Sequence, residues 1–393
     1  MASDPATQSD SAEIQNSPTS LGTQKQNFWK ALRQRPYFTA VLAYVVARLA
    51  TLLFLLISDP FLHRSLSTEL RLWDGTWFLR AVENGWPTHL PMINGHVAAN
   101  PIAFFPLLPL LIKGAGVSGI PVVVLGVLIS GIMGLIAVIG VGALTRTFAS
   151  REQAERAALL FALFPGGFVF SLIYSEGLVI TFVAFGLIAL LQKKWWRAGI
   201  LGLLASASSP VGLAFIISCC WCAGRSIQKD RNWSSLAAPI LAPLGFVAWM
   251  GFLWAHTGNV WAWRLTEKGG WKSYPSLMYP INIVTKFALN PTAPTMTGQI
   301  LFLGTIVAGG GIYLAWRERQ PMAIFLYGVA AVGAAALSAP VGLRPRFLLL
   351  AFPLIIAVGT HFSGWKYRSI LILEIMLLIL MTALSFNSFA VFP

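Results

Sequence analysis

The fold of this chain is decided by Tyr37-Phe-Thr-Ala-Val-Leu-Ala-Tyr-Val-Val-Ala-Arg-Leu-Ala-Thr-Leu-Leu-Phe-Leu-Leu-Ile-Ser58. At about 1.5 Å per residue, a helix of this length extends over roughly 33 Å, enough to cross a bilayer core of about 30 Å. The whole chain is 56% hydrophobic and 11% charged, with a mean hydropathy of +0.70 over 393 residues. That leaves too little polar surface to cover a soluble globule. The sequence therefore predicts an all-α polytopic membrane protein.

The basic residues before this segment predict its orientation. Lys30, Arg33 and Arg35 lie directly before it, and Lys and Arg are enriched on the cytoplasmic side of membrane spans. Residues 1–35 are expected to form a disordered cytoplasmic tail without a cleaved signal peptide, because they contain little that could be buried. Residues 36–393 are expected to form a single integral membrane domain.

About eleven transmembrane helices are expected in the remaining chain. The region 198–224 is interpreted as two short helices that turn at Ser208-Ser209-Pro210, and residues 102–112 as a short helix at the membrane that does not cross it. A long outer loop with juxtamembrane helices, ending in residues 102–112, is therefore expected after the first span. The expected crossings are 37–58, 121–144, 157–174, 177–191, the pair within 198–224, 234–254, 299–316, 322–339, 347–361 and 370–384.

The net charge of +14 does not indicate a nucleic-acid-binding protein, because the basic residues are scattered between apolar segments. Cys219, Cys220 and Cys222 lie in one apolar segment without a neighbouring His or carboxylate. We interpret them as buried apolar residues and predict no metal site. No cofactor is predicted either.

In this predicted topology, the polar clusters that are not needed to set the orientation of the helices all fall on the outer side of the membrane. They are Trp73-Asp74-Gly75 with Trp77, Tyr174-Ser175-Glu176, Ser208-Ser209-Pro210, the loop 257–271 and Arg344-Pro345-Arg346. Two arginines in a short outer turn indicate an anionic partner, and phosphate suits paired guanidinium groups. Six carboxylates share that side: Asp59, Glu69, Asp74, Glu83, Glu176 and Glu267. A carboxylate base and phosphate-binding cations are what a sugar hydroxyl needs to attack a phosphate-activated sugar.

The run Arg71-Leu-Trp-Asp-Gly-Thr-Trp-Phe78, with Ala103-Phe-Phe-Pro-Leu-Leu-Pro-Leu-Leu111, resembles the signature of the PIG-V (GPI mannosyltransferase II-like) membrane glycosyltransferases, which have the GT-C fold. Later blocks occur in the same order, and the resemblance covers roughly residues 40–360. One position departs from it: relatives carry an arginine where this chain has Ser209. That difference affects the expected binding of the donor phosphate.

The resemblance implies an enzyme, a mannosyltransferase that uses a polyprenyl-phosphate-mannose donor and inverts the anomeric carbon. Its acceptor would be a glycolipid or cell-envelope glycan. The enzyme would lie in the lipid of the cell membrane, or of the endoplasmic reticulum if the source is eukaryotic, with its active site on the non-cytoplasmic face. Asp74 matches the acidic residue of the first outer loop and is the expected catalytic base. The expected substrate-binding residues are Trp73, Gly75, Trp77, Tyr174, Glu176, Arg344, Arg346 and Arg48.

Simpler interpretations remain beside these. Asp74 could cap a helix, the outer tryptophans could form an interfacial belt, and Glu176 could mark the tip of a helical hairpin. Arg48 is costly inside a span and is expected to pair inward, with Glu374 of the last span as a candidate counter-ion. A transporter or flippase for a lipid-linked sugar is the alternative function, since it also needs intramembrane charge and a polar cavity.

Overall fold

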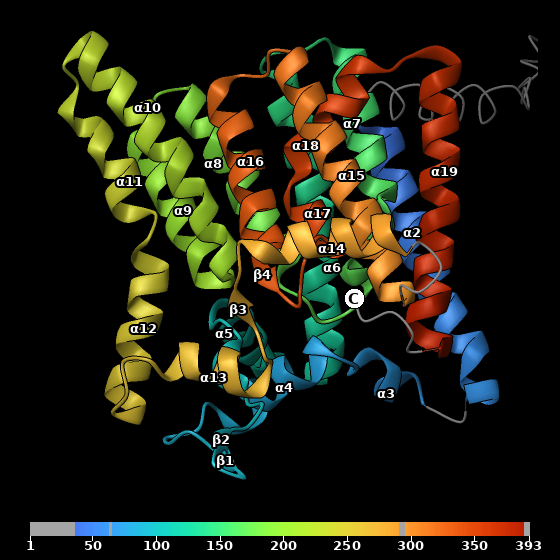
Figure 1. Ribbon diagram of the computed structural model, residues 1–393, viewed down its shortest axis with the longest axis vertical. Helices are drawn as coiled ribbons and strands as arrows, with labels where there is room; N and C mark the ends of the chain where they lie inside the picture. Colours follow the sequence, from blue (N-terminus) through green and yellow to red (C-terminus); the bar gives the residue numbers. More distant parts are fainter. Residues whose placement is uncertain (1–35, 63–64, 291–294, 389–393) are drawn as a thin grey trace, which may run out of the picture.

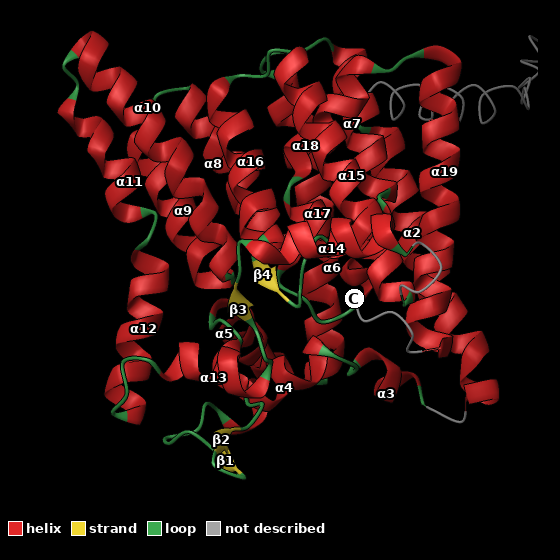
Figure 2. Ribbon diagram, in the orientation of Figure 1, coloured by secondary structure: helices red, strands yellow, loops and turns green. Residues whose placement is uncertain are grey.

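The computed structural model describes residues 36–62, 65–290 and 295–388, and almost all of its regular structure is helical. Figure 1 shows long helices packed into a bundle, with short helices and a hairpin gathered at one end. Figure 2 shows how little strand there is beside the helices. The predicted disordered tail, residues 1–35, lies outside the described residues.

The first half of the chain, up to residue 214, contains helices that alternate with short connections. Its elements are α2 (Phe38–Leu62), α3 (Leu66–Leu70), α4 (Asp74–Asn84), β1 (Met92–Ile93), β2 (His96–Val97), η1 (Pro101–Ala103), α5 (Leu107–Ala115), η2 (Gly116–Ser118), α6 (Val122–Arg146), α7 (Arg151–Leu163), η3 (Pro165–Ser171), α8 (Glu176–Leu191), α9 (Trp195–Ser208) and η4 (Pro210–Ala214).

The second half adds the remaining bundle helices and a second pair of short strands. Its elements are α10 (Phe215–Asp230), η5 (Trp233–Leu236), α11 (Ala237–Leu241), α12 (Leu244–Thr257), α13 (Ala262–Gly270), β3 (Tyr274–Pro275), α14 (Met278–Leu289), α15 (Met296–Arg317), α16 (Met322–Ala336), β4 (Ser338–Ala339), α17 (Pro345–Leu350), α18 (Phe352–His361), α19 (Gly364–Ala383) and η6 (Leu384–Ser388).

Within the described residues, five helical segments are long and apolar enough to cross a membrane, and up to seven if each of two bent pairs is one span. The five include the predicted first span, here Phe38–Ile57, and the predicted last one, here Gly364–Phe386. These segments leave much of their apolar surface exposed, as lipid-facing helices do. The predicted class, a helical protein of the membrane, is therefore confirmed.

Two predicted crossings are bent pairs of helices, and a third, at 347–361, is divided between α17 and α18. The segment predicted at 157–174 is the pair α7 and η3, which bends by 67°. Phe164 has the extended backbone that a residue before proline prefers, and Pro165 follows it. The segment predicted at 234–254 contains η5, α11 and α12, with a bend of 43° before Leu244. The apolar runs predicted how long these segments are, but not their bends.

The region 198–224 forms two helices, as predicted. α9 ends at Ser208, Ser209 is extended, and η4 begins at Pro210 before α10. Proline after an extended residue ends the first helix and opens the next. The helix predicted at 102–112 starts later, at Leu107 after Pro106, and continues to Ala115 as α5.

The described strands form two short antiparallel pairs. β1 pairs with β2 antiparallel, in the loop that follows α4. β3 pairs with β4 antiparallel, with Tyr274 opposite Ala339 and Pro275 opposite Ser338. The second pair ties the segment after α13 to the connection between α16 and α17, so both flank the same space.

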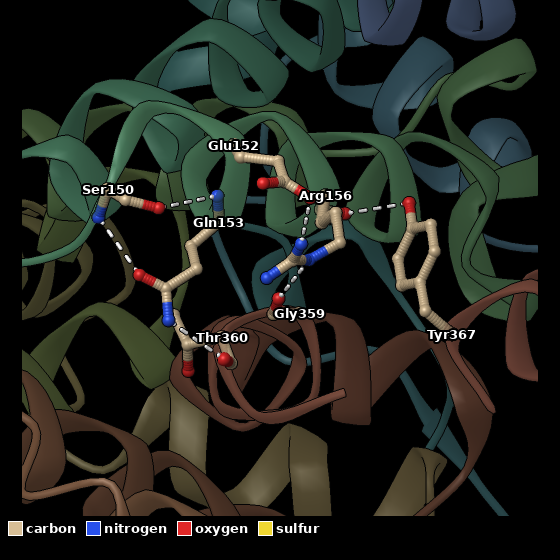
Figure 3. Close-up of polar contacts among 7 residues, drawn as sticks. All are labelled: Ser150, Glu152, Gln153, Arg156, Gly359, Thr360 and Tyr367. Carbon is tan, nitrogen blue, oxygen red and sulfur yellow. Dashed lines mark hydrogen bonds and ion pairs between the residues drawn. The ribbon is translucent and has the colours of Figure 1, made fainter. Parts of the chain in front are cut away.

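At the other end of the bundle, α7 is fastened to α18 (Figure 3). The Ser150 and Gln153 side chains form a capping box at the start of α7. Gln153 Nε2 also donates to the Thr360 carbonyl at 2.9 Å, and Arg156 Nε donates to the Gly359 carbonyl at 3.1 Å. Carbonyls of the last turn of a helix lack hydrogen-bond donors within that helix. Here the side chains of α7 donate to the carbonyls at the end of α18. This end of the bundle is therefore held by polar contacts, separate from the site described next.

Candidate functional site

A cavity of about 840 Å³ lies between the bundle and the outer layer of short elements. Every polar cluster singled out in the sequence contributes to its wall: the starts of α4, α8 and α17, the turn between α9 and η4, and α13 with the residues after it. Clusters that are far apart in the sequence thus meet at one cavity. Its charged residues are three acids, Asp74, Glu176 and Glu267, and three bases, Arg264, Arg344 and Arg346.

Asp74 is the first residue of α4, and its carboxylate points toward α17. The residue before it, Trp73, occupies the N-cap position with φ 52° and ψ −122°, and no side chain caps the helix there. The helix-cap interpretation of Asp74 is therefore wrong. Positive φ is strained for a bulky side chain and is found where the surroundings impose it, often at functional sites. Trp73 packs against Phe386, with 5.1 Å between ring centres.

Arg346 holds two of the carboxylates together. Its Nη1 donates to Asp74 Oδ2 at 2.6 Å, and its Nε lies 3.6 Å from Glu176 Oε1. Its guanidinium carbon lies 5.2 Å from the centre of the Tyr174 ring and 4.5 Å from that of Phe347. Burial lowers the pKa of Arg346, but the carboxylates of Asp74 and Glu176 outweigh burial and hold the pKa above its ordinary value. The guanidinium is therefore a permanent cation between two acids.

The position of Arg346 depends on a close backbone contact. Gly166 of η3 lies against the Pro345 carbonyl group at the start of α17, where a side chain on residue 166 would collide with the backbone. Because glycine has no Cβ, η3 and α17 can approach closely enough to place Arg346 over Tyr174. The cavity wall thus relies on a glycine outside the cavity.

Gly166→Ala is expected to lower any activity of this site by about tenfold or more, because a shift of α17 moves Arg346 away from Asp74. Gly167→Ala is the matched control: a Cβ there would have its nearest neighbour at 3.8 Å, an ordinary contact. The comparison is made on purified variants, with thermal unfolding measured alongside. Equal activity in the two variants would contradict the role given to the Gly166 contact.

Arg344, Ser208 and Ser209 line the cavity on the same side as Arg346. Burial and the neighbouring Arg346 cation lower the pKa of Arg344. Ser208 Oγ donates to the Leu204 carbonyl, and Ser209 Oγ accepts from the amide of Val211. Ser209 therefore supports the turn between α9 and η4, Ser208 bonds within the last turn of α9, and both line the cavity. Ser209 supplies a small hydroxyl in place of the arginine expected from the resemblance.

Glu267 forms part of the opposite wall, on α13. The sequence identified it as an outer carboxylate but assigned it no role. Burial raises the pKa of Glu267 to about 7, against a hydrogen bond with Ser273 and the positive charge of Arg264. A pattern could have found it, because Trp263, Glu267 and Trp271 are spaced at four-residue intervals and so share one side of a helix. All three line the cavity.

Trp77 also lines the cavity, but three predicted site residues do not. Gly75 is buried, and a Cβ there would lie 3.2 Å from the Leu70 carbonyl oxygen, so its role is packing. Tyr174 is a buried support beneath Arg346. Arg48 donates to the Gly167 carbonyl and lies 5.2 Å from the centre of the Tyr44 ring.

Two further expectations change with the structure. No ion pair joins Arg48 to Glu374 within the described residues. The interfacial-belt interpretation fits the exposed Trp261, but not Trp263 and Trp271, which line the cavity. Of the other outer carboxylates, Glu83 pairs with Arg71 at 3.2 Å and does not line the cavity.

The described part of the chain contains no cluster of three or more His, Cys, Asp or Glu residues able to hold a metal ion. The three cysteines are free. No protein-family model matches this chain, and no curated protein matches it either.

Proposed function

We propose that this protein is a membrane glycosyltransferase that moves mannose from a polyprenyl-phosphate-mannose donor to a hydroxyl of a glycolipid or cell-envelope glycan, with inversion. The observation that carries the proposal is the pairing of a carboxylate and a guanidinium, Asp74 and Arg346, at 2.6 Å in the wall of one cavity. Proton removal and phosphate binding are the two tasks of such a transfer, and these groups suit them.

In the proposed reaction the acceptor oxygen attacks the anomeric carbon from the side opposite the phosphate. A new carbon–oxygen bond forms as the bond from that carbon to the phosphate oxygen breaks, and polyprenyl phosphate leaves with the electron pair. Asp74 takes the acceptor proton and later releases it to water. Arg346 and Arg344 stabilise the negative charge that grows on the departing phosphate.

The dimensions and lining of the cavity support this choice. A volume of about 840 Å³ is within the range of small-molecule sites. Apolar and aromatic residues form much of its wall, with the charged groups grouped within it. We further propose that the bent and shorter helices complete about eleven crossings of a GT-C-like fold, with the cavity on the non-cytoplasmic face.

The direct test is a transfer assay with the purified protein, polyprenyl-phosphate-[¹⁴C]mannose and a panel of glycolipid acceptors. The expected result is a radioactive glycolipid and free polyprenyl phosphate in equal amounts. Movement of the lipid-linked sugar across vesicle membranes without any transfer would instead favour the transporter.

The proposed orientation is tested with single cysteines in a chain whose three native cysteines are replaced by serine. Cysteines at Glu83 and Trp261, which are exposed on the outer layer, are expected to react with an impermeant maleimide added to intact cells. Cysteines at Glu152 and Lys194 are expected to react only after lysis, because their loops carry the basic residues of the cytoplasmic side. Labelling of both pairs in intact cells would contradict this topology.

A further inference from the structure

The wall made by α13 and Trp271 has the chemistry of a sugar-binding surface. Trp271 lies at right angles to two other rings, with 5.2 Å between its centre and that of Trp77 and 5.5 Å to that of Phe104. Its orientation is therefore fixed before any ligand binds, so little side-chain entropy is lost on binding. An indole offers a broad apolar surface whose negative face attracts polarised C–H groups.

Glu267 is held beside this ring by contacts of its own helix. Thr266, the preceding residue, accepts a hydrogen bond from Asn100 Nδ2 at 3.2 Å. At the end of α13, a Cβ on Gly269 would lie 2.6 Å from the Val97 carbonyl oxygen, so glycine allows the helix to lie against the outer loop. The carboxyl group therefore has a fixed place in the wall. A carboxylate can accept hydrogen bonds from two neighbouring hydroxyls.

The two walls of the cavity differ in their arginines, although each also carries acids: Asp74 and Glu176 contact Arg346 on the α17 wall, and Glu267 lies on α13. Arg344 and Arg346 belong to the α17 wall, together with the Ser208-Ser209 turn. The one arginine on α13, Arg264, donates to the Ser273 carbonyl at 3.2 Å. A phosphate suits the two arginines and is repelled by an ionised Glu267. The uncharged partner of the reaction therefore belongs beside α13.

We propose that the α13 wall binds a pyranose ring of the acceptor, with Glu267 accepting hydrogen bonds from its hydroxyl groups and Trp271 packing against its C–H face. The proposal rests on the proposed function, because it names where the acceptor of that reaction binds. It also predicts that ligand binding depends on pH. The ionised carboxylate accepts two hydrogen bonds more strongly than the neutral acid, so binding weakens as the pH falls through the pKa of Glu267, about 7.

The groups around Glu267 set this pH dependence, and the other cavity acid whose pKa burial raises, Glu176, faces Arg346 on the α17 wall. Asp74 raises its pKa and Arg264 lowers it. The elements packed on α13 bring two histidines: His96 of β2 is exposed, and His256 of α12 has its Nε2 2.9 Å from the Trp86 carbonyl oxygen. Neither histidine lines the cavity. A Glu267→Gln variant should therefore bind the sugar with no dependence on pH in this range.

The test measures binding of octyl α-D-mannopyranoside by calorimetry, with the full-length protein in a detergent that carries no sugar. Glu267→Gln is expected to weaken binding about tenfold at pH 8, and Trp271→Ala by a similar factor. Trp271→Phe keeps the packing against Trp77 and should bind within a few-fold of the wild type. Trp261→Ala is the matched control, because that indole is 66% exposed at the start of the same helix and does not line the cavity.

In the transfer assay, Glu267→Gln and Trp271→Ala should raise the KM for the acceptor and leave the KM for the donor unchanged, and Trp261→Ala should change neither. Wild-type affinity and pH dependence in Glu267→Gln, or equal losses in Trp261→Ala and Trp271→Ala, would overturn the proposal. Transfer by a wild-type protein that does not bind the mannoside would overturn this proposal alone. Binding of the mannoside without any transfer would support a sugar-binding site at the α13 wall and contradict the proposed function.

Discussion

Asp74→Asn is expected to lower the rate of sugar transfer by about 10²-fold or more, within the range of general base catalysis. The amide keeps the size of the side chain and can still accept a hydrogen bond from Arg346, so α4 and the cavity should remain in place. What is lost is the group that accepts the proton of the attacking hydroxyl. The measurement is kcat in the transfer assay, together with binding of the lipid-linked donor, which should change little.

Two comparisons make this prediction specific. Glu83→Gln changes another carboxylate of α4, one that pairs with Arg71 outside the cavity, and should retain the wild-type rate. Asp74→Glu keeps the charge but displaces it by a methylene, and should also be impaired because the base loses its alignment. A normal kcat in Asp74→Asn would transfer the base to Glu176 or Glu267, the other carboxylates of the cavity.

The sequence predicted the members of the site better than their contacts. The sequence indicates Asp74 as a carboxylate between tryptophans and, separately, Arg346 as an outer cation in a short turn. Their ion pair joins residues 272 positions apart. No local pattern encodes such a contact, because it depends on how η3 and α17 pack around Gly166.

The lengths of the apolar runs and the positions of the prolines explain most of the agreement and most of the disagreement in the fold. Proline after an extended residue divides α9 from η4, and this break was predicted at Ser208-Ser209-Pro210. The similar break at Pro165 was not predicted, because the apolar run around Pro165 is long enough to be one span. Tryptophans raise a similar ambiguity: Trp261 and Trp271 have the same chemistry, and only tertiary packing exposes one and places the other in the cavity.

The structure also changes what the replacement of Arg346 tests. With phosphate binding alone, Arg346→Ala would reduce use of the donor. Because Arg346 also contacts Asp74 and Glu176, the variant leaves two neighbouring carboxylates without their shared cation. Removing one partner of a buried ion pair destabilises a protein by about 3–5 kcal/mol. We expect the lower end of this range or less, because the side chains of Arg346 and Asp74 are 15% and 23% exposed.

Arg346→Ala is therefore expected to lower kcat by about 10²–10³-fold, the range for loss of one preorganised charge at a developing anion, and to lower the thermal unfolding temperature. Arg346→Lys should restore stability more than activity, because an ammonium can pair with Asp74 but cannot reproduce the two-pronged geometry of a guanidinium toward phosphate.

Glu176→Gln provides the control that separates these effects. It removes the negative charge from the weaker contact, at 3.6 Å, and leaves the ion pair of Arg346 with Asp74 intact. If Arg346 acts mainly on the phosphate, Glu176→Gln should retain most of the activity while Arg346→Ala loses it at every donor concentration. If the two variants lose activity equally, the cation serves to hold the carboxylates, and Arg344 is then the residue that meets the phosphate.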